Sequence, residues 1–428
     1  MRSAMESSGR SDRHHGRGAA RVLYVTYDGL TDPLGQSQVL PYLTGLSQCG
    51  HRITILSCEK RSAMDKEGDA IRKLCDSNGL DWQPLRYHKT PPVLSSTFDL
   101  AMLRRAAVRL NRSRTFDLVH CRSYIPAAAA LSLKRRAGVR LLFDMRGFWP
   151  EEKTEGKNWD LGNPLFWLVY RYFKQIESRV LADSDAIVSL TEVGKSELLR
   201  RPELRGEEDR VAVIPCCVDV ELFGSAGPEA RRATRRQLGI ESDSRVLVYL
   251  GSLGGNYMLG EMFDFFRVYR ARHPGARFLF VTREEAGAIR AEASRREIDK
   301  GELLIRPARR DDVPSLLAAG DLGIAFKQPS FSALGCSPTK MGEMLAVGLP
   351  IVANAGVGDV ADIIGRTACG VAVTEFSEEA YVRALAELDA HANDAPGRRR
   401  TAAQCFDVGI GIERYDRIYR RLSAPVGN

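Results

Sequence analysis

Short apolar segments and longer amphipathic segments alternate along most of the chain. Residues 21–27 (RVLYVTY) are apolar almost without interruption, which is typical of a strand buried on both faces of a parallel sheet. A polar segment with glycine at 29–38 predicts a loop, and the apolar spacing within 39–46 predicts a helix. Residues 52–57 predict the next strand. The chain therefore opens with a strand, a loop, a helix and a strand, the order of a βαβ unit.

The same alternation continues and restarts once. We expect further strands in the first part at 80–87, 117–122, 139–145, 186–191 and 211–215. After a charged linker, strands are expected at 245–250, 276–282, 302–307, 321–326, 349–354 and 370–374. Helical spacing separates them, as in residues 97–112, 164–182, 378–391 and 410–422. The pattern predicts an α/β protein of two Rossmann-like, doubly wound parallel-sheet lobes that face each other across a cleft.

Length and composition agree with two lobes. The chain has 428 residues, of which 44% are hydrophobic, so it can form two cores and is not a disordered chain. Residues 1–19 predict a basic, flexible tail, 20–222 a first lobe and 223–404 a second lobe. No apolar run approaches the ~20 residues that span a bilayer, and the tail has no apolar stretch of signal-peptide length. We therefore expect a cytoplasmic protein.

The nine cysteines are scattered, without CxxC or Cys/His ligand spacing. They predict reduced thiols rather than disulfides or a zinc site, and no metal site is expected.

Positive charge is concentrated in one region. The net charge is +8, and between residues 101 and 140 the only acid is Asp117. The basic residues there are Arg104, Arg105, Arg109, Arg112, Arg114, Arg122, Lys134, Arg135, Arg136 and Arg140. A solvated helix face and a docking surface for phosphate groups both fit this pattern. Binding of nucleic acid is not expected, because no recognition motif or interleaving of aromatic and basic residues accompanies the charge.

The segment LFWLVYRYF at 165–173 is rich in aromatic residues at helical spacing. Core packing explains such a segment. An interfacial membrane helix also explains it, because Trp and Tyr favour that layer.

The densest signal for ligand binding lies in the second lobe, where Ser337, Thr339 and Lys340 fall at the predicted start of a helix. Free N–H groups and positive partial charge at a helix N-terminus bind phosphate, and Lys340 adds a full charge. Glu343, one turn further on, is placed to accept hydrogen bonds from ribose hydroxyls. An ordinary helix start with a proline, Pro338, is the alternative explanation.

Two glycine-containing loops and two arginines complete the candidate residues. The loop 251–255 (GSLGG) suits close approach to an anion, and its candidates are Gly251, Ser252 and Gly254. The first-lobe loop offers polar groups for a polyhydroxyl acceptor, namely Gly35, Gln36, Ser37 and Gln38. Arg122 and Arg146 follow neighbouring strands and would form an anion clamp, although surface salt bridges are the common alternative for arginine.

Three stretches together resemble a known family. They are RVLYVTYDGLTDPLGQSQVLPYLTGL at 21–46, VAVIPCCVDVELF at 211–223 and SPTKMGEMLAVGLPIVAN at 337–354. Their order and spacing are similar to those of the GT-B-fold retaining glycosyltransferases called glycosyltransferase family 4. The resemblance covers about residues 20–423.

The resemblance implies a function and residue roles. The second lobe would bind a nucleotide-diphosphate sugar, with Glu343 on the second glutamate of the family's E-x7-E motif, and the first lobe would bind the acceptor. The helix within 405–428 would cross back onto the first lobe. The reaction implied is hexosyl transfer with retention, without a metal or cofactor. The acceptor would be a glycan or a lipid-linked hydroxyl in cell-surface polysaccharide or glycolipid synthesis, and together with the basic region this suggests an anionic membrane surface on the cytoplasmic face as a further partner.

The sequence also departs from the family. Gly335 replaces the first glutamate of E-x7-E, and Ser252 and its uncharged neighbours stand where the family has Arg and Lys. Arg122 and Arg146 stand where histidines are often found, so we assign catalytic roles to these two arginines and Lys340. These departures keep two alternatives open, a GT-B-fold sugar-nucleotide epimerase and a non-catalytic nucleotide-sugar-binding paralogue.

Overall fold

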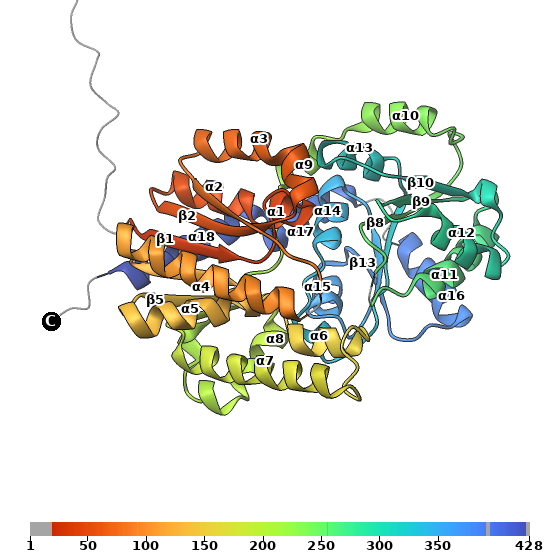
Figure 1. Cartoon of the computed structure of the whole chain (residues 1–428). Coiled ribbons are helices and arrows are strands. Elements are labelled where there is room, and N and C mark those ends of the chain that lie inside the picture. The colour runs from red at the N-terminus through yellow and green to blue at the C-terminus, as the bar shows by residue number, and fades with distance from the viewer. Residues whose placement is uncertain (1–18, 92, 255, 391–393, 425–428) are drawn as a thin grey trace, which may run out of the picture.

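The computed structural model describes residues 19–91, 93–254, 256–390 and 394–424, which form two α/β lobes side by side (Figure 1). Of the tail predicted at 1–19, residues 1–18 lie outside the described residues. The first lobe has a seven-stranded sheet in the order β3-β2-β1-β4-β5-β6-β7, and the second has a six-stranded sheet in the order β10-β9-β8-β11-β12-β13. All strand pairs within the two sheets are parallel. Each lobe thus has the doubly wound order 3-2-1-4-5-6, which confirms the predicted fold class.

The thirteen strands lie close to the predicted positions. Those of the first lobe are β1 (Arg21–Thr26), β2 (Arg52–Glu59), β3 (Asp81–Arg86), β4 (Leu118–Arg122), β5 (Arg140–Asp144), β6 (Ala186–Ser189) and β7 (Val211–Val213). Those of the second are β8 (Val246–Leu250), β9 (Arg277–Val281), β10 (Leu303–Arg306), β11 (Leu322–Ala325), β12 (Ile351–Asn354) and β13 (Gly370–Val373).

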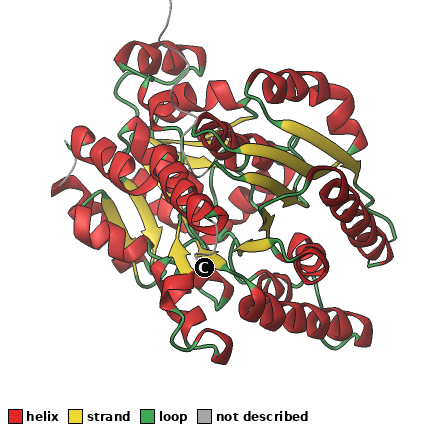
Figure 2. Ribbon diagram, turned by 90° about the vertical axis from the view of Figure 1, so that its left-hand side faces the viewer, coloured by secondary structure: helices red, strands yellow, loops and turns green. Residues whose placement is uncertain are grey.

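Helices cover both faces of both sheets, as Figure 2 shows. The chain runs from α1 to α8 in the first lobe: α1 (Pro33–Gln38), α2 (Leu40–Gln48), α3 (Arg61–Ser77), α4 (Leu94–Arg114), α5 (Tyr124–Ala137), α6 (Trp149–Glu155), α7 (Pro164–Asp183) and α8 (Glu192–Leu199). It continues with α9 (Val220–Gly224), α10 (Pro228–Gln237), α11 (Leu259–Arg272), α12 (Ala286–Arg295), α13 (Val313–Ala318), α14 (Thr339–Val347), α15 (Val360–Thr367), α16 (Glu378–Ala390), α17 (Ala395–Phe406) and α18 (Val408–Ser423). Within the described residues, no helix combines the length and the apolar character that a membrane span requires.

The strands of the first sheet are apolar on both faces because both faces are covered. Leu23 and Val25 of β1 lie in a core with α4, α5 and α7, whereas Val22 and Tyr24 lie in a core with α2, α3 and α18. The second sheet repeats this arrangement: Val248 of β8 packs toward α13, α14, α15 and α17, and its neighbours in β8 pack toward α11, α12 and α16. The uninterrupted apolar strands seen in the sequence follow from this double burial.

The chain crosses between the lobes at two places that lie side by side. Val218 donates its backbone N–H to the carbonyl of Phe406 (2.7 Å) and accepts a hydrogen bond from the N–H of Val408 (3.0 Å). After the second crossing, α18 packs against α2 and β4 of the first lobe, whereas α17 packs against α14 of the second. We propose these crossings as the limits of the lobes, with α9 counted in the second lobe because it packs against α14 and α17.

One element of the first βαβ unit differs from the prediction. Residues 33–38 were expected in a loop but form the short helix α1. Pro33 favours the first helical position, and Gly35 lets the helix lie against the backbone of Gly29 and Leu30, where a built Cβ would come within 2.1 Å of the Gly29 carbonyl oxygen. Glycine is therefore needed here for close packing rather than for a flexible loop.

A buried carboxylate, Glu59, anchors the turn that follows β1. Its oxygens accept hydrogen bonds from the N–H of Leu30 (2.7 Å), the N–H and hydroxyl of Thr31 (3.2 and 2.5 Å) and the hydroxyl of Ser57 (2.6 Å). Gly29 is required because a Cβ there would meet Glu59 Oε2 at 2.6 Å. The carboxylate thereby fixes the segment that leads into one wall of the cleft.

We expect Glu59→Gln to lower the free energy of unfolding by about 2–3 kcal/mol. The amide NH2 group of glutamine is a hydrogen-bond donor, and it would face N–H and hydroxyl groups that are donors as well. Urea unfolding of the purified protein measures the change. Glu67→Gln, on the exposed face of α3, is the matched control and should unfold like the wild type. Equal stability of the two variants would contradict the anchoring role.

Candidate functional site

A cleft lies between the lobes, at the carboxyl ends of the strands where ligands bind in doubly wound sheets. Its first-lobe wall includes Tyr27 and Asp28 after β1, Arg122 at the end of β4, and Arg146 after β5. These are the strands beside the point where the strand order reverses. The second-lobe wall consists of Lys327, Ser332, Gly335, Cys336 and Ser337. The two lobes therefore present their switch points to one shared space.

The first-lobe wall is built around Asp144, at the end of β5. Its carboxylate lies 3.7 Å from Arg122 Nη1 and 3.8 Å from Arg146 Nη1; Asp144 and Arg122 are buried, and the Arg146 side chain is 10% exposed. Burial opposes ionisation of Asp144, but Arg146, His120 and Arg122 outweigh burial and lower its pKa. Arg122 also pairs with Asp28 through Nε (3.1 Å). Arg122 and Arg146 thus share one buried counter-charge, and their role as an anion clamp stays a prediction.

The backbone turns sharply at Arg146 to present this side chain. Its φ of 59° lies in the left-handed region, and Gly147 follows with a φ of 101°. Arg146 Nη2 lies 3.0 Å from the sulfur of Cys216. Cys216 lies at the edge of the first-lobe wall of the cleft. Strained backbone of this kind gathers at functional sites.

In the second lobe, Lys340 is a buried cation in an aromatic setting. Its Nζ donates a hydrogen bond to the hydroxyl of Tyr249 (2.8 Å) and lies 3.6 Å from the ring centre of Tyr257. Among the described residues, no carboxylate lies within ion-pair distance of this Nζ. Burial lowers the pKa of Lys340 to about 7. An anion bound beside Nζ would favour the protonated, positively charged form of this amine. Gly251, with a φ of 101°, lies beside the amine, since a Cβ there would be 3.4 Å from Nζ.

Glu343 lies one turn further along α14. Its carboxylate is buried and lies 3.4 Å from Arg310 Nη1. Burial raises the pKa of Glu343, although Arg310 opposes the shift. Arg310 thus holds one carboxylate oxygen of Glu343. This contact orients the carboxylate so that it can accept hydrogen bonds from hydroxyl groups of a ligand.

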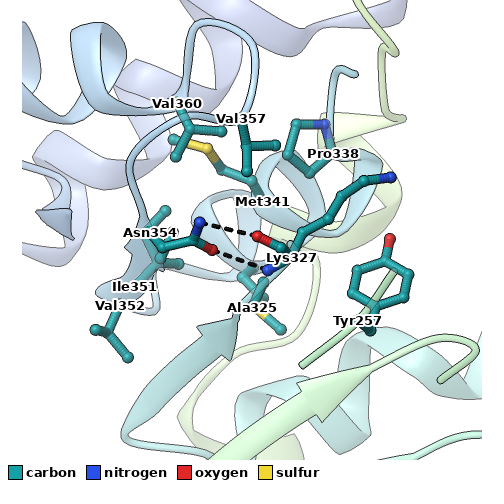
Figure 3. Close-up of a pocket in the computed structure, with 12 residues that line it drawn as sticks. Tyr257, Ala325, Lys327, Pro338, Met341, Ile351, Val352, Asn354, Val357 and Val360 are labelled. Atoms are coloured by element: carbon teal, nitrogen blue, oxygen red, sulfur yellow. Dashed lines mark hydrogen bonds between the residues drawn. The ribbon is translucent and has the colours of Figure 1, made fainter. Parts of the chain in front are cut away.

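Lys327 is a second cation of this lobe, placed just after β11. Figure 3 shows how Asn354, at the end of β12, holds its backbone: the Asn354 side chain accepts from the Lys327 N–H (2.8 Å) and donates to the Lys327 carbonyl (2.9 Å). The lysine side chain extends past Pro338 and lies with its Nζ 5.6 Å from the ring centre of Tyr257. No carboxylate of the described chain forms an ion pair with it. Lys327 and Lys340 therefore approach the same tyrosine.

The segment Ser332–Gly335 of the second lobe presses directly against the first lobe. A Cβ on Gly335 would lie 3.0 Å from the Cα of Gly147, so the two glycines are in contact. Glu155 accepts hydrogen bonds from the N–H of Ser332 (3.2 Å), and Thr191 donates to the carbonyl of Leu334 (2.6 Å). The family's glutamate, which Gly335 replaces, would not fit in this arrangement.

The predicted site residues fall into two groups. Arg122, Arg146, Ser337, Lys340 and Gly251 lie at or beside the cleft, with Thr339 and Glu343 on the first turns of α14. Ser252 and Gly254 are exposed in the loop after β8, and Gly255 lies outside the described residues. Gly35, Gln36, Ser37 and Gln38 lie in α1; the amide of Gln38 donates to the carbonyl of Cys217 (2.9 Å), and Leu34 is the member of α1 that lines the cleft. The acceptor role of these four residues stays a prediction.

Lys327, Arg310 and Cys216 were not predicted as site residues from the sequence. Lys327 had a signal, since it directly follows a predicted strand, where site residues are expected in this fold. Arg310 had none, because its partner Glu343 is 33 residues away in the sequence. Within the residues described, no group of three or more His, Cys, Asp or Glu side chains is placed to hold a metal ion. Metal independence itself stays a prediction.

We expect Lys340→Met to stabilise the protein at pH 7. The folded-state pKa near 7 is below the ~10.4 of an unfolded lysine, so the unfolded state binds an extra proton between these values, and wild-type stability rises with pH in that window. The advantage of the variant should shrink by about 2 kcal/mol between pH 7 and pH 9. Urea unfolding at both values measures it, with the exposed Lys300→Met as control. An advantage that does not change with pH would contradict the burial of this amine.

Known proteins share this architecture. Residues 36–217 match a family model described as a glycosyl transferase 4-like domain. A glycosyltransferase from Rickettsia africae ESF-5 superposes with a TM-score of 0.69 at 15% identity, over 94% of this chain and 98% of that one. Sucrose-phosphate synthase from Thermosynechococcus elongatus gives 0.70 at 14% identity, over 94% and 98%. Anabaena HepE in complex with UDP-glucose gives 0.66 at 14% identity, over 93% and 99%.

No curated protein sequence matches the chain significantly. At these identities the structural likeness shows the fold, and the family model covers most of the first lobe. The two findings confirm the resemblance drawn from the sequence motifs. The chain therefore has the GT-B fold, and its first lobe contains a glycosyl transferase 4-like domain.

Proposed function

We propose that this protein transfers a hexose from a nucleotide-diphosphate sugar to a hydroxyl acceptor, with retention of configuration at the anomeric carbon. The observation that carries the proposal is the pair Lys340 and Lys327, two cations without carboxylate partners in the described chain, beside the N-terminus of α14 at the cleft. A diphosphate supplies the negative charge that this arrangement lacks.

Related structures support a nucleotide-sugar ligand. HepE has been solved with UDP and with UDP-glucose, and the catalytic domain of starch synthase IV from Arabidopsis thaliana with ADP and acarbose. In this chain, the buried Glu343 would accept hydrogen bonds from the ribose. The N–H groups at the start of α14, where no side chain forms a cap, would contact the phosphates.

Charge stabilisation of the leaving group is the main catalytic contribution we propose. Negative charge grows on the diphosphate as the glycosidic bond breaks, and preorganised donors in a site shielded from water stabilise it most. Lys340, protonated once the diphosphate is bound, and Lys327 would act from the second lobe, with Arg146 acting from the first. The close contact of the lobes at Gly147 and Gly335 would limit access of water and so hydrolysis of the donor.

Retention is proposed to follow from attack on the face of the leaving group. Of the two carboxylates that line the cleft, Asp28 is paired with Arg122 and Glu152 is exposed. Neither is held as a free nucleophile against the sugar. An oxygen of the donor's own phosphate would then accept the proton from the acceptor hydroxyl, and no metal takes part in this scheme.

The acceptor is proposed to be a glycan or a lipid-linked hydroxyl, used on the cytoplasmic side in cell-surface polysaccharide or glycolipid synthesis. An epimerase would convert the donor without any acceptor. A non-catalytic paralogue would bind the nucleotide and show no turnover. Product formation that requires an acceptor separates the proposed transferase from both.

Lys340→Met and Glu343→Gln should each weaken binding of a nucleotide diphosphate by about 1–3 kcal/mol, the range for a lost hydrogen bond to a charged group. Isothermal titration with UDP, ADP and GDP measures the change. The exposed residues Lys300 and Glu379 supply the matched controls, Lys300→Met and Glu379→Gln, which should bind like the wild type. Unchanged affinity in both site variants would overturn the donor-site assignment.

Arg146→Gln should lower the rate of transfer by about a hundredfold, with little change in donor affinity, because its charge acts on the transition state. Steady-state kinetics with the donor and acceptor that support turnover measure the effect. The product of the wild-type enzyme should keep the donor's anomeric configuration by NMR. An inverted product would overturn the proposed stereochemistry, and an unaltered rate would remove Arg146 from the site.

A further inference from the structure

The basic region of the first lobe divides into paired and unpaired residues. Five of its members form ion pairs, namely Arg114 with Asp81, Arg122 with Asp28, Lys134 and Arg140 with Asp185, and Arg135 with Asp183. Five others line one groove between α4 and α5: Arg104, Arg105, Arg109, Arg112 and Arg136. These five are exposed, and none forms an ion pair with a carboxylate of the described chain. We call them the arginine groove.

The arginine groove is a costly arrangement for a free protein. Arg105 and Arg109 are four residues apart on α4, and Arg109 and Arg112 are three apart, so like charges lie side by side on the helix surface. Convergence of unpaired guanidinium groups is the pattern expected where a surface with several negative charges is bound.

Exposed apolar residues lie on the same side of the lobe. In α7, Leu165, Leu168 and Tyr172 follow helical spacing along one face and are 50%, 60% and 40% exposed. Other side chains of α7, including Phe173 and Val180, lie in the core. Core packing therefore explains only part of this aromatic segment, because Leu165, Leu168 and Tyr172 stay 40–60% exposed.

The neighbouring helices extend this apolar area. Trp167 of α7 is 48% exposed, and Leu94 and Phe98 in the first turns of α4 are 68% and 53% exposed. Helix α5 packs against both α4 and α7, and the three helices cover one face of the first sheet (Figure 1). Both α4 and α7 begin on the side nearer the second lobe (Figure 1), so the apolar residues lie toward the cleft and the arginine groove lies further away.

We propose that the α4–α5–α7 face of the first lobe docks on the surface of an anionic lipid bilayer. The arginine groove binds lipid phosphates, and the apolar residues of α7 and α4 enter the interfacial layer, where Trp and Tyr are favoured. A nucleic acid would satisfy the arginines but leave the apolar residues without a partner. The docking does not depend on the transfer reaction proposed above. If that reaction takes place, docking brings the cleft close to a lipid-linked acceptor.

Flotation of the full-length protein with phosphatidylcholine vesicles, with and without phosphatidylglycerol, tests the proposal. We expect salt-sensitive binding only to vesicles that contain phosphatidylglycerol. The triple variant R104Q/R105Q/R109Q should bind these vesicles on the order of a hundredfold more weakly, since each charge near the surface contributes about 1 kcal/mol, or about fivefold. The control R232Q/R236Q/R267Q removes the same charge from exposed arginines of the second lobe and should bind like the wild type.

Insertion of the apolar residues has a separate readout. Tryptophan emission should shift to the blue on phosphatidylglycerol vesicles, and Trp167→Phe should lose most of that shift while it still binds. An unchanged melting temperature of each variant shows that folding is intact. Unchanged nucleotide affinity of R104Q/R105Q/R109Q separates the docking face from the donor site.

Three results would overturn the proposal. The first is no binding to phosphatidylglycerol vesicles. The second is an equal loss in the two triple variants, which would show an effect of net charge alone. The third is that the protein binds single-stranded RNA and that R104Q/R105Q/R109Q abolishes this binding but leaves vesicle binding unchanged. That result would assign the arginine groove to nucleic acid.

Discussion

The contact between Gly147 and Gly335 governs the rest of the site. Two residues without side chains allow the backbones of the two lobes to meet, and this contact brings Arg146 of one lobe toward the lysines of the other. It also explains the most conspicuous departure from the family's motif, because a glutamate at 335 would occupy the space that Gly147 and Phe148 fill. The replacement of the motif's glutamate by Gly335 and the close approach of the two lobes therefore have the same structural basis.

Loss of that glutamate and of the family's basic pair changes how charge is distributed across the cleft. The second lobe supplies Lys340, which is half-neutral at physiological pH because burial lowers its pKa to about 7, and Lys327. The first lobe supplies Arg146 and Arg122, held by the single buried Asp144. Positive charge thus comes from both sides, so the full electrostatic field of the site exists only when the lobes are together.

Sequence patterns predicted the sheets well because both faces of each strand are buried, which leaves runs of apolar residues that stand out locally. They predicted Lys340 and Glu343 because a helix start after a strand is a local feature. They missed α1, because glycine and polar residues read as a loop although Gly35 allows close packing on the preceding turn, and they missed Arg310, because it acts only through Glu343, which is distant in the sequence. The position of the aromatic residues of α7 was ambiguous for the same reason. When a helix is apolar on two faces, its sequence does not show which face packs in the core.

The paired crossings at Val218 and Asp407 have a mechanical consequence. Because both connecting segments run side by side and share the hydrogen bonds of Val218, the lobes are joined along a single narrow line rather than at two separated points. Such a joint permits rotation about one axis and resists twisting. Opening to admit a donor is then a swing of one lobe about this axis, and such a swing separates Gly335 of the second lobe from Gly147 of the first.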